Sequence, residues 1–347
     1  MPAARFGWMG VDLFFVLSGY LIGLQLLRPY ARGERVSAWN FYRNRGYRIL
    51  PAYGVVAILY FTLPGWAEDT SLSPLWQYIT FTFNLCVDYA NRQGFSQVWS
   101  LCVEEHFYLL LPIIVLVMMR RPSLRKTVAA IAALVVVGIA VRSYMLVHVL
   151  RPMAERGEPF GMLYIERIYY PTYSRLDGLL AGVSLALIRT FRPLWWNSLA
   201  RRGQLLMVGG ATLIALAMYM FKERFTSVDG VSAASVVIGF PVLEMGLALM
   251  VASALSTNGW LRLRIPGAQT VANLAYCLYL TQKEMFHLVD AWFPHLESVG
   301  RLPWLAVYLG VCLAVAAVLH VCVERPFLRL RDRQGARRME TAVAPAD

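Results

Sequence analysis

Ionisable side chains interrupt several stretches of this sequence that otherwise consist of apolar residues. The residues that stand out in this way are Asp12, Glu104, Glu105, His106, Arg142, Arg175, Asp177, Lys283, Glu284 and His287. A carboxylate can orient a proton-accepting imidazole and stabilise its cation, and a buried arginine or lysine can stabilise an oxyanion. We therefore regard these residues as candidates for a reaction centre, with structural ion pairs as the alternative interpretation.

Helical spacing sorts these candidates into groups. Ser100, Glu104 and Tyr108 follow one another at intervals of four residues, so they share one face of a helix. A second face of this kind is formed by Tyr276, Tyr279 and Lys283. Arg175 and Asp177 are only two residues apart, which places them on different faces, and each therefore needs a partner of its own.

The composition is that of a membrane protein with several spanning segments. Of the 347 residues, 58 % are hydrophobic and 16 % are charged, whereas typical soluble domains have roughly 45–50 % and 25 %. The mean hydropathy is +0.51. These values exclude a disordered chain, a disulfide scaffold and an ordinary soluble enzyme. The net charge of +12 comes from basic residues clustered in short loops, so we interpret it as a topology signal and expect no nucleic-acid partner.

Apolar segments of suitable length predict an all-α fold, a polytopic transmembrane helical bundle of about nine spanning helices. These helices are expected near residues 10–27, 49–66, 101–119, 127–149, 172–191, 203–221, 232–255, 269–289 and 302–324. The stretch 74–88 is short and carries polar residues. We expect it to be a re-entrant or interfacial piece that does not cross the membrane.

The basic loops set the orientation of these helices. Loops 28–48 and 120–126 and the C-terminal tail carry dense groups of basic residues, which predicts that they are cytoplasmic. The candidate residues then fall in the outer half of the membrane, where we expect one polar cluster contributed by five helices. With a cytoplasmic C-terminus, nine helices would leave the N-terminus outside the cell. Membrane proteins more usually have both termini in the cytoplasm, so we expect one further helix before the first.

The sequence carries no signature of a metal or disulfide site. No two histidines have the spacing of metal ligands, and the five cysteines form no Cys-x-x-Cys pair, so we expect neither a metal nor disulfides. Gly178 and Gly182 form a G-x-x-x-G pattern, which predicts close packing of their helix against another helix.

Six phrases, in this order along the chain, carry a resemblance to a known family. They are Gly10 to Gly19 (GVDLFFVLSG), Phe41 to Pro51 (FYRNRGYRILP), Trp99 to Tyr108 (WSLCVEEHFY), Tyr173 to Gly178 (YSRLDG), Ala275 to Leu280 (AYCLYL) and Val323 to Pro326 (VERP). The sequence resembles the acyltransferase-3 family of bacterial integral-membrane proteins, which O-acylate surface glycans and related molecules. We therefore expect an N-terminally incomplete acyltransferase domain over residues 1–331 and a disordered cytoplasmic tail over 332–347.

The resemblance implies that the protein is an enzyme that moves an acyl group, expected to be acetyl, from acyl-CoA to a hydroxyl of a surface glycan or a similar acceptor. The candidates for the reaction centre are Glu104, Asp12, Arg175, Asp177 and Lys283, with His106 as a fallback base. Arg45 and Arg48 match the family's Arg-x-x-Arg motif and are expected to bind the phosphates of the donor. Arg43 either joins them or serves only as a topology signal. Acyl-CoA is a co-substrate, no cofactor is expected to stay bound, and the expected location is the inner membrane.

The sequence departs from the family pattern in two places. The family's first helix carries an arginine and a histidine taken as the catalytic base, and this helix would precede Gly10. The family usually has a second histidine where Gln282 stands, and an amide cannot accept a proton in its place. These departures favour one alternative, a catalytically impaired scaffold of the same family. A secondary transporter is a weaker alternative, because the sequence shows no internal repeat.

The predicted orientation can be tested by cysteine labelling from outside the cell. A cysteine placed at position 157, in loop 150–171, is expected to react with a membrane-impermeant thiol reagent, whereas one at position 34 is expected to be protected. The reverse pattern would contradict both the orientation and the assignment of the candidate residues to the outer half of the membrane.

Overall fold

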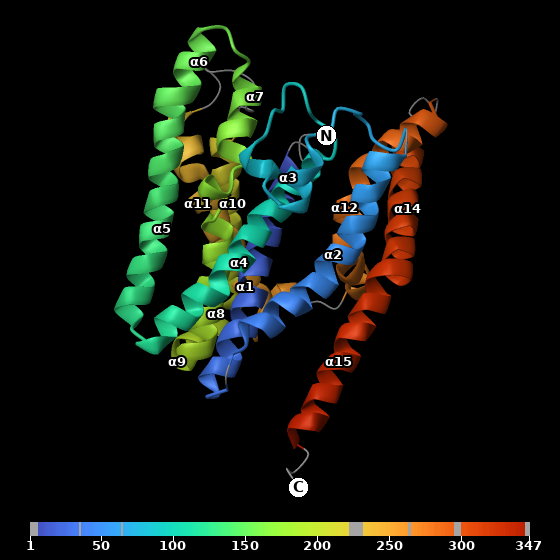
Figure 1. Ribbon diagram of the computed structural model, residues 1–347. Helices are drawn as coiled ribbons and strands as arrows, with labels where there is room; N and C mark the ends of the chain where they lie inside the picture. The colour runs from blue at the N-terminus through green and yellow to red at the C-terminus, as the bar shows by residue number, and fades with distance from the viewer. Residues whose placement is uncertain are drawn as a thin grey trace. The chain divides into compact units, whose positions relative to one another are not determined.

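The computed structural model describes residues 6–34, 36–63, 65–221, 232–262, 265–294 and 300–343. All regular secondary structure in these ranges is helical, as predicted. The α-helices, most of them labelled in Figure 1, are α1 (Met9–Ala31), α2 (Ala38–Thr62), α3 (Leu75–Ile79), α4 (Trp99–Arg120), α5 (Leu124–Tyr144), α6 (Arg151–Glu155), α7 (Phe160–Tyr164), α8 (Asp177–Phe191), α9 (Pro193–Ala200), α10 (Gly203–Met220), α11 (Phe240–Ala254), α12 (Ala268–Trp292), α14 (Arg301–Leu319) and α15 (Arg325–Val343).

Six helical segments in the described part of the chain are long and apolar enough to cross a membrane. They are Met9–Ala31, Ser96–Arg120, Leu124–Glu155, Gly203–Met220, Ser235–Ala254 and Arg301–Gln334. The other three predicted spans correspond to α2 and α12, which are less apolar, and to α8, which has 15 residues. The stretch 74–88 contains only α3 and the short turn Phe83–Leu85, so no long helix forms there, in agreement with the prediction.

Two boundaries differ from the sequence-based prediction. Helix α2 begins at Ala38, because the side chain of Ser37 accepts a hydrogen bond from the backbone N–H of Asn40 and caps the helix. Much of the predicted loop 28–48 is therefore helical. Helix α15 continues through residues 332–343, where the sequence predicts a disordered tail. It extends a helix already formed upstream, and no proline interrupts it there. Residues 344–347 lie outside the described residues.

The chain divides into two compact units. Unit 1 comprises Met1–Val36, Ile79–Ala90 and Trp99–Leu263, and unit 2 comprises Ser37–Tyr78, Asn91–Val98 and Arg264–Asp347. Unit 1 thus contains α1, α4 and the helices from α5 to α11. Unit 2 contains α2, α12, α14 and α15.

Unit 1 is organised around the crossing of α1 and α8. The backbone of Leu179 on α8 lies so close to Gly19 that any side chain at this position of α1 would collide with it. Gly182 in turn lies against the backbone carbonyl of Val16 and the backbone nitrogen of Tyr20. The close packing predicted from the G-x-x-x-G pattern is confirmed for Gly182, which lets the backbones of α8 and α1 approach. Gly178 instead lies against the carboxyl of Glu244 on α11.

Unit 2 is held together by hydrogen bonds from one face of α12. The phenol of Tyr276 donates to the backbone carbonyl of Ile49 on α2 (2.9 Å). The phenol of Tyr279 donates to the carbonyl of Gln97 (2.5 Å). The predicted face Tyr276, Tyr279 and Lys283 therefore points into the unit, towards α2 and the segment 93–97.

Candidate active site

Arg175 and Asp12 form a buried ion pair that joins the start of α8 to the first turn of α1. The two side chains are 1 % and 0 % exposed and contact each other through Nη2 and Oδ1. The guanidinium of Arg175 also lies 4.0 Å from the ring centre of Phe240 and 4.8 Å from that of Tyr169. Aromatic faces attract a cation, and they exclude water from this pair, so the pair is the electrostatic centre of unit 1.

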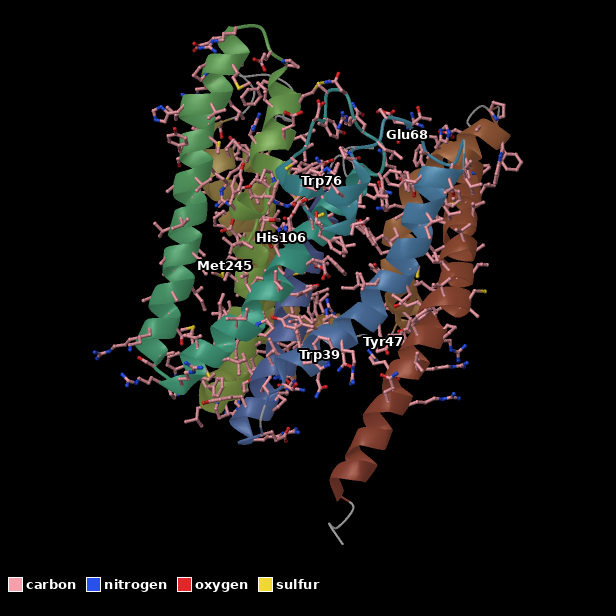
Figure 2. All side chains as sticks on the ribbon, in the orientation of Figure 1. Trp39, Tyr47, Glu68, Trp76, His106 and Met245 are labelled. Atoms are coloured by element: carbon pink, nitrogen blue, oxygen red, sulfur yellow. The ribbon has the colours of Figure 1, made fainter. Side chains whose placement is uncertain are left out.

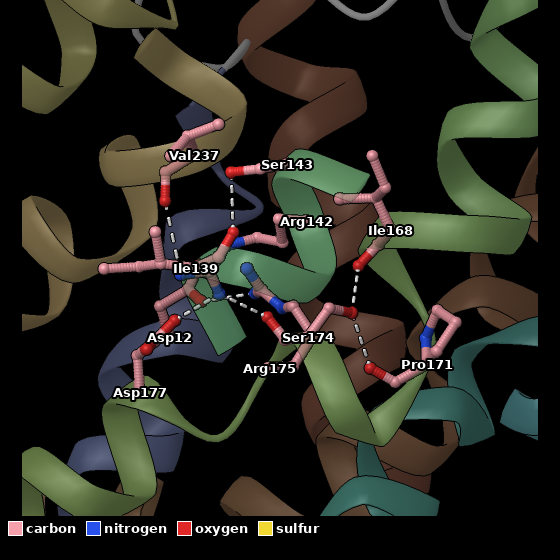
Figure 3. A network of polar contacts seen from close by, with 10 residues as sticks. All are labelled: Asp12, Ile139, Arg142, Ser143, Ile168, Pro171, Ser174, Arg175, Asp177 and Val237. Carbon is pink, nitrogen blue, oxygen red and sulfur yellow. Dashed lines mark hydrogen bonds and ion pairs between the residues drawn. The ribbon is translucent and has the colours of Figure 1, made fainter. Parts of the chain in front are cut away.

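Arg142 and Asp177 form a second buried ion pair. Nη1 of Arg142 lies 2.5 Å from Oδ2 of Asp177 and donates to the backbone carbonyl of Ser174 (2.7 Å), as Figure 3 shows. Nη2 donates to the carbonyl of Val237 (3.3 Å). The prediction that Arg175 and Asp177 need separate partners is confirmed. Asp12 is the partner of Arg175, and Arg142 is the partner of Asp177.

A third carboxyl group, that of Glu244, completes this charge cluster. Glu244 is 2 % exposed, and its carboxyl lies against Gly178 on α8. Three carboxyl groups face two arginines, and Asp12 Oδ2 and Glu244 Oε2 have no hydrogen-bond donor among the described residues. The place of Glu244 in the cluster follows from the fold and not from its spacing along the chain.

The phenol of Tyr164 lies beside these ion pairs. It belongs to α7 and is completely buried, and no motif or spacing in the sequence indicates its role. Burial raises the pKa of Tyr164, so its phenol stays neutral next to the two arginines.

Glu104 lies on α4 with its carboxylate inside unit 1. It is 2 % exposed, and the phenol of Tyr108 lies 2.9 Å from its Oε2. The hydroxyl of Ser18, on α1, is 3.0 Å from the same phenol. The predicted face of Glu104 and Tyr108 is confirmed. At the start of α4, the ring of Trp99 lies 5.6 Å from the guanidinium of Arg175, which links the Glu104 group to the charge cluster.

His106 points away from this group. It follows Glu104 by two residues, so it lies on another face of α4, and its Nδ1 is 2.7 Å from the hydroxyl of Thr172. The side-chain amide of Asn84, from the stretch 74–88, donates to the same hydroxyl (2.8 Å). His106, labelled in Figure 2, also lines an apolar cavity of about 160 Å³ between α4, α5 and α8. Its neighbours are thus Thr172 and apolar side chains rather than Glu104.

Lys283 belongs to unit 2 and has three partners there. Its ammonium donates to the carbonyl of Gln93 (3.1 Å) and to the hydroxyl of Ser96 (3.2 Å), and it lies 3.4 Å from the carboxylate of Glu68. The next residue, Glu284, is 1 % exposed and accepts a hydrogen bond from the side chain of Gln97 (2.7 Å). The sequence did not indicate the contact between Gln97 and Glu284, because these residues are far apart in the chain.

The candidate donor-binding arginines lie in the first half of α2, in unit 2. Arg43 and Arg45 are half-buried and Arg48 is exposed. The phenol of Tyr47 donates to the side-chain carbonyl of Gln334 on α15 (3.2 Å), which holds this part of α2 against α15. The described part of α15 adds further basic residues, Arg325, Arg329, Arg331 and Arg333. This end of unit 2 is therefore strongly basic.

The pair of Arg142 and Asp177 should control the stability of unit 1. Asp177→Asn leaves the buried guanidinium uncompensated, so we expect it to lower the free energy of unfolding by about 3–5 kcal/mol. The exposed pair of Arg331 and Asp332 provides the control, since Asp332→Asn should cost less than about 1 kcal/mol. Unfolding in detergent is the measurement. The double variant Arg142→Met, Asp177→Leu should be more stable than Asp177→Asn, and equal losses for the two single variants would contradict this account.

Comparisons with known proteins agree with the resemblance drawn from the sequence. No solved structure matches the chain. The chain is 30 % identical over 200 residues to the O-acetyltransferase OatA of Staphylococcus aureus, a match that covers 52 % of this chain and 30 % of the relative. It is 30 % identical over 212 residues to the putative peptidoglycan O-acetyltransferase YrhL of Bacillus subtilis, covering 56 % and 31 %.

The peptidoglycan O-acetyltransferase OatA of Listeria monocytogenes is 28 % identical over 204 residues, covering 55 % of this chain and 31 % of the relative. The matches thus span about a third of the length of these relatives. The family model of an acyltransferase domain, Acyl_transf_3, matches residues 3–321. A match over nearly the whole chain, which includes both buried ion pairs and Glu104, shows that this chain belongs to the acyltransferase-3 family of membrane proteins.

Proposed function

We propose that this protein transfers an acetyl group from acetyl-CoA, bound at the cytoplasmic side, to a hydroxyl of a glycan at the outer side of the bacterial plasma membrane. The single observation that carries this proposal is the buried Glu104 carboxylate, held by Tyr108 in a chain of an acyltransferase family. Two of the relatives are O-acetyltransferases, one of them of peptidoglycan, which supports acetyl as the acyl group and a glycan as the acceptor.

Glu104 is suited to stabilise a proton-accepting group. A hydroxyl is a weak nucleophile at neutral pH, so it needs a base within hydrogen-bond reach when it attacks the thioester. The base becomes a cation as it takes the proton, and a buried carboxylate stabilises that cation. One oxygen of Glu104 is oriented by Tyr108. The same carboxylate can thus fix the direction of the base as well as its charge.

The arginines of the charge cluster are suited to positioning rather than to direct catalysis. Arg175 and Arg142 are both buried and already contact carboxylates. An oxyanion would have to compete with these partners for the same N–H groups. Asp12, Arg175 and Asp177 therefore act by fixing α1 and α8, which carry the hydroxyl of Ser18 next to Tyr108.

His106 is a second candidate for the base. Its Nδ1 is 2.7 Å from the hydroxyl of Thr172, which orients the ring, and the ring is half-buried. In this alternative the acceptor hydroxyl would approach through the side of α4 that faces Thr172, and Glu104 would have no direct part in proton transfer.

The basic end of unit 2 is suited to the phosphates of the donor. Guanidinium groups form charge-assisted, often bidentate, hydrogen bonds with phosphate. Arg45 and Arg48 are three residues apart and share a face of α2, where a single phosphate group can reach both. By the positive-inside rule this end faces the cytoplasm, where acyl-CoA is made.

Glu104→Gln tests the proposed role of the carboxylate. The amide keeps the shape and can still accept from Tyr108, but it cannot stabilise a cation, so we expect the rate of acetyl transfer to a glycan acceptor to fall by about 100-fold or more. Glu105→Gln is the matched control, because it makes the same change at the next, half-buried residue. Unchanged transfer in Glu104→Gln, together with a loss in His106→Gln, would assign the base role to His106 instead.

Arg45→Ala and Arg48→Ala test the donor site. Each substitution removes a charge-assisted contact worth roughly 1.5–3 kcal/mol, so we expect the KM for acetyl-CoA to rise about tenfold or more. Arg333→Ala, an exposed arginine on α15, is the control for a general loss of positive charge. If all three variants raise KM by the same small factor, the arginines of α2 act only as part of a diffuse basic surface.

A further inference from the structure

A polar cavity of about 440 Å³ lies at one end of unit 2. Its lining residues are Glu68, Gln282, Lys283, Phe286, His287, Asp290 and Tyr308. The cavity is formed by the last turns of α12, the first half of α14 and the segment that follows α2, where Glu68 is labelled in Figure 2. Its size falls within the range of about 300–1,000 Å³ that is usual for small-molecule sites. We refer to it as the α12–α14 pocket.

The polar groups of the pocket come mainly from one stripe of α12. Gln282, Phe286 and Asp290 follow one another at intervals of four residues, so they line one wall. Lys283 and His287 are also four residues apart, and they lie on α12 next to this wall. The lining contains the carboxylates of Glu68 and Asp290 and a single ammonium, that of Lys283. Such a surface offers both donors and acceptors, and it disfavours an anion.

Three aromatic rings form a rigid group at this wall. The rings of Trp304 and Tyr308 are stacked, with centres 5.6 Å apart and planes 8° apart, and Phe286 meets both edge-on. The indole N–H of Trp304 donates to Asp290 (3.2 Å) and the phenol of Tyr308 donates to the carbonyl of Gln282 (3.3 Å). These hydrogen bonds fix the rings in place. The side chain of Phe286 is exposed.

A rigid aromatic group beside hydroxyl-binding side chains is suited to a sugar. The C–H bonds of a pyranose ring carry partial positive charge, which the negative face of an aromatic ring attracts. Its hydroxyls both donate and accept, and the pocket offers carboxylate, amide and imidazole groups to meet them. Aromatic residues also gather at membrane interfaces to anchor helices. Anchoring accounts for the rings but not for five polar side chains lining a cavity beside them.

The pocket lies at the end of unit 2 opposite to the basic end. Helix α2 carries Arg43, Arg45 and Arg48 in its first half and ends at Thr62, shortly before Glu68. Helix α14 runs from the pocket towards α15. Figure 2 shows Glu68 at one end of α2, with Trp39 and Tyr47 at the other end. If the arginines face the cytoplasm, the pocket faces the outer side, where glycans are found.

We propose that the α12–α14 pocket binds one uncharged sugar residue of a glycan, with the sugar ring against Phe286 and its hydroxyls hydrogen-bonded to Asp290, Gln282 and His287. The assignment of this sugar to the acceptor glycan rests on the proposed function. The binding of a sugar in the pocket does not depend on it.

The binding test uses the full chain in lipid nanodiscs and isothermal titration calorimetry with the trisaccharide of N-acetylglucosamine. The trisaccharide of galacturonic acid serves as the anionic comparison. Phe286→Leu keeps an apolar side chain but removes the flat ring, and we expect the Kd to rise about threefold to tenfold. Asp290→Asn removes a charged acceptor, and we expect a rise of about tenfold.

Phe327→Leu is the matched control, because Phe327 on α15 is as exposed as Phe286, at 42 %. The Kd of the Phe327→Leu variant for the uncharged trisaccharide should equal that of the unaltered protein. Three outcomes would overturn the proposal: no binding of the uncharged trisaccharide, tighter binding of the anionic one, or an unchanged Kd in both pocket variants. The last outcome would leave the aromatic rings as membrane anchors.

A separate assay of acetyl transfer distinguishes this inference from the proposed function. Sugar binding that depends on Phe286 and Asp290, without any acetyl transfer, supports the pocket and contradicts the proposed function. Acetyl transfer with a Kd that neither variant changes contradicts the pocket alone.

Discussion

The constraint on which unit 1 depends is the neutralisation of charges buried within it. Two arginines and three carboxyl groups lie together, and the groups of both ion pairs are almost completely shielded from solvent. The desolvation of each ion costs several kcal/mol, and only a partner at close range offsets it. The partners come from α1, α5, α8 and α11, so these four helices have to meet at one place.

This constraint depends in turn on the small residues of α1 and α8. Asp12 reaches Arg175 because the two helices cross at backbone contact, through Gly19 and Gly182. A larger residue at either position would force the backbones apart and lengthen the ion pair. The same crossing sets the position of Ser18, whose hydroxyl lies next to Tyr108 and so next to Glu104. The packing of two glycines and the orientation of the candidate catalytic carboxylate are thus parts of one arrangement.

The sequence predicts those features of the site that depend on local spacing. The four-residue interval predicts that Tyr108 and Glu104 share a helix face, and their side chains do form a hydrogen bond. The two-residue interval predicts different partners for Arg175 and Asp177, which the structure also shows. Which partner each residue takes is a different matter. Asp12 and Arg175 are 163 positions apart, and several carboxylates of similar depth could have met that arginine. Spacing along one helix carries no information about which helices are neighbours.

The same limit applies to the boundaries and to the aromatic pocket. Basic residues mark loop 28–48 as a topology signal, yet charge does not prevent a helix, and the cap at Ser37 starts one there. The rings of Phe286 and Trp304 come from different helices, and they are recognisable as one group only in the folded unit.

The arrangement of unit 2 bears on how transfer across a membrane would work. Its two ends differ in charge and in chemistry, with a group of arginines at one end and a pocket lined by polar and aromatic side chains at the other. Acyl-CoA is a large polyanion, and moving it through an apolar bundle would expose several charges to a low dielectric. Moving only the acyl group, with the phosphates left at the arginines, avoids that cost. If each end of unit 2 recognises one substrate from its own side of the membrane, only the thioester end of the donor has to enter the bundle. That end carries no charge.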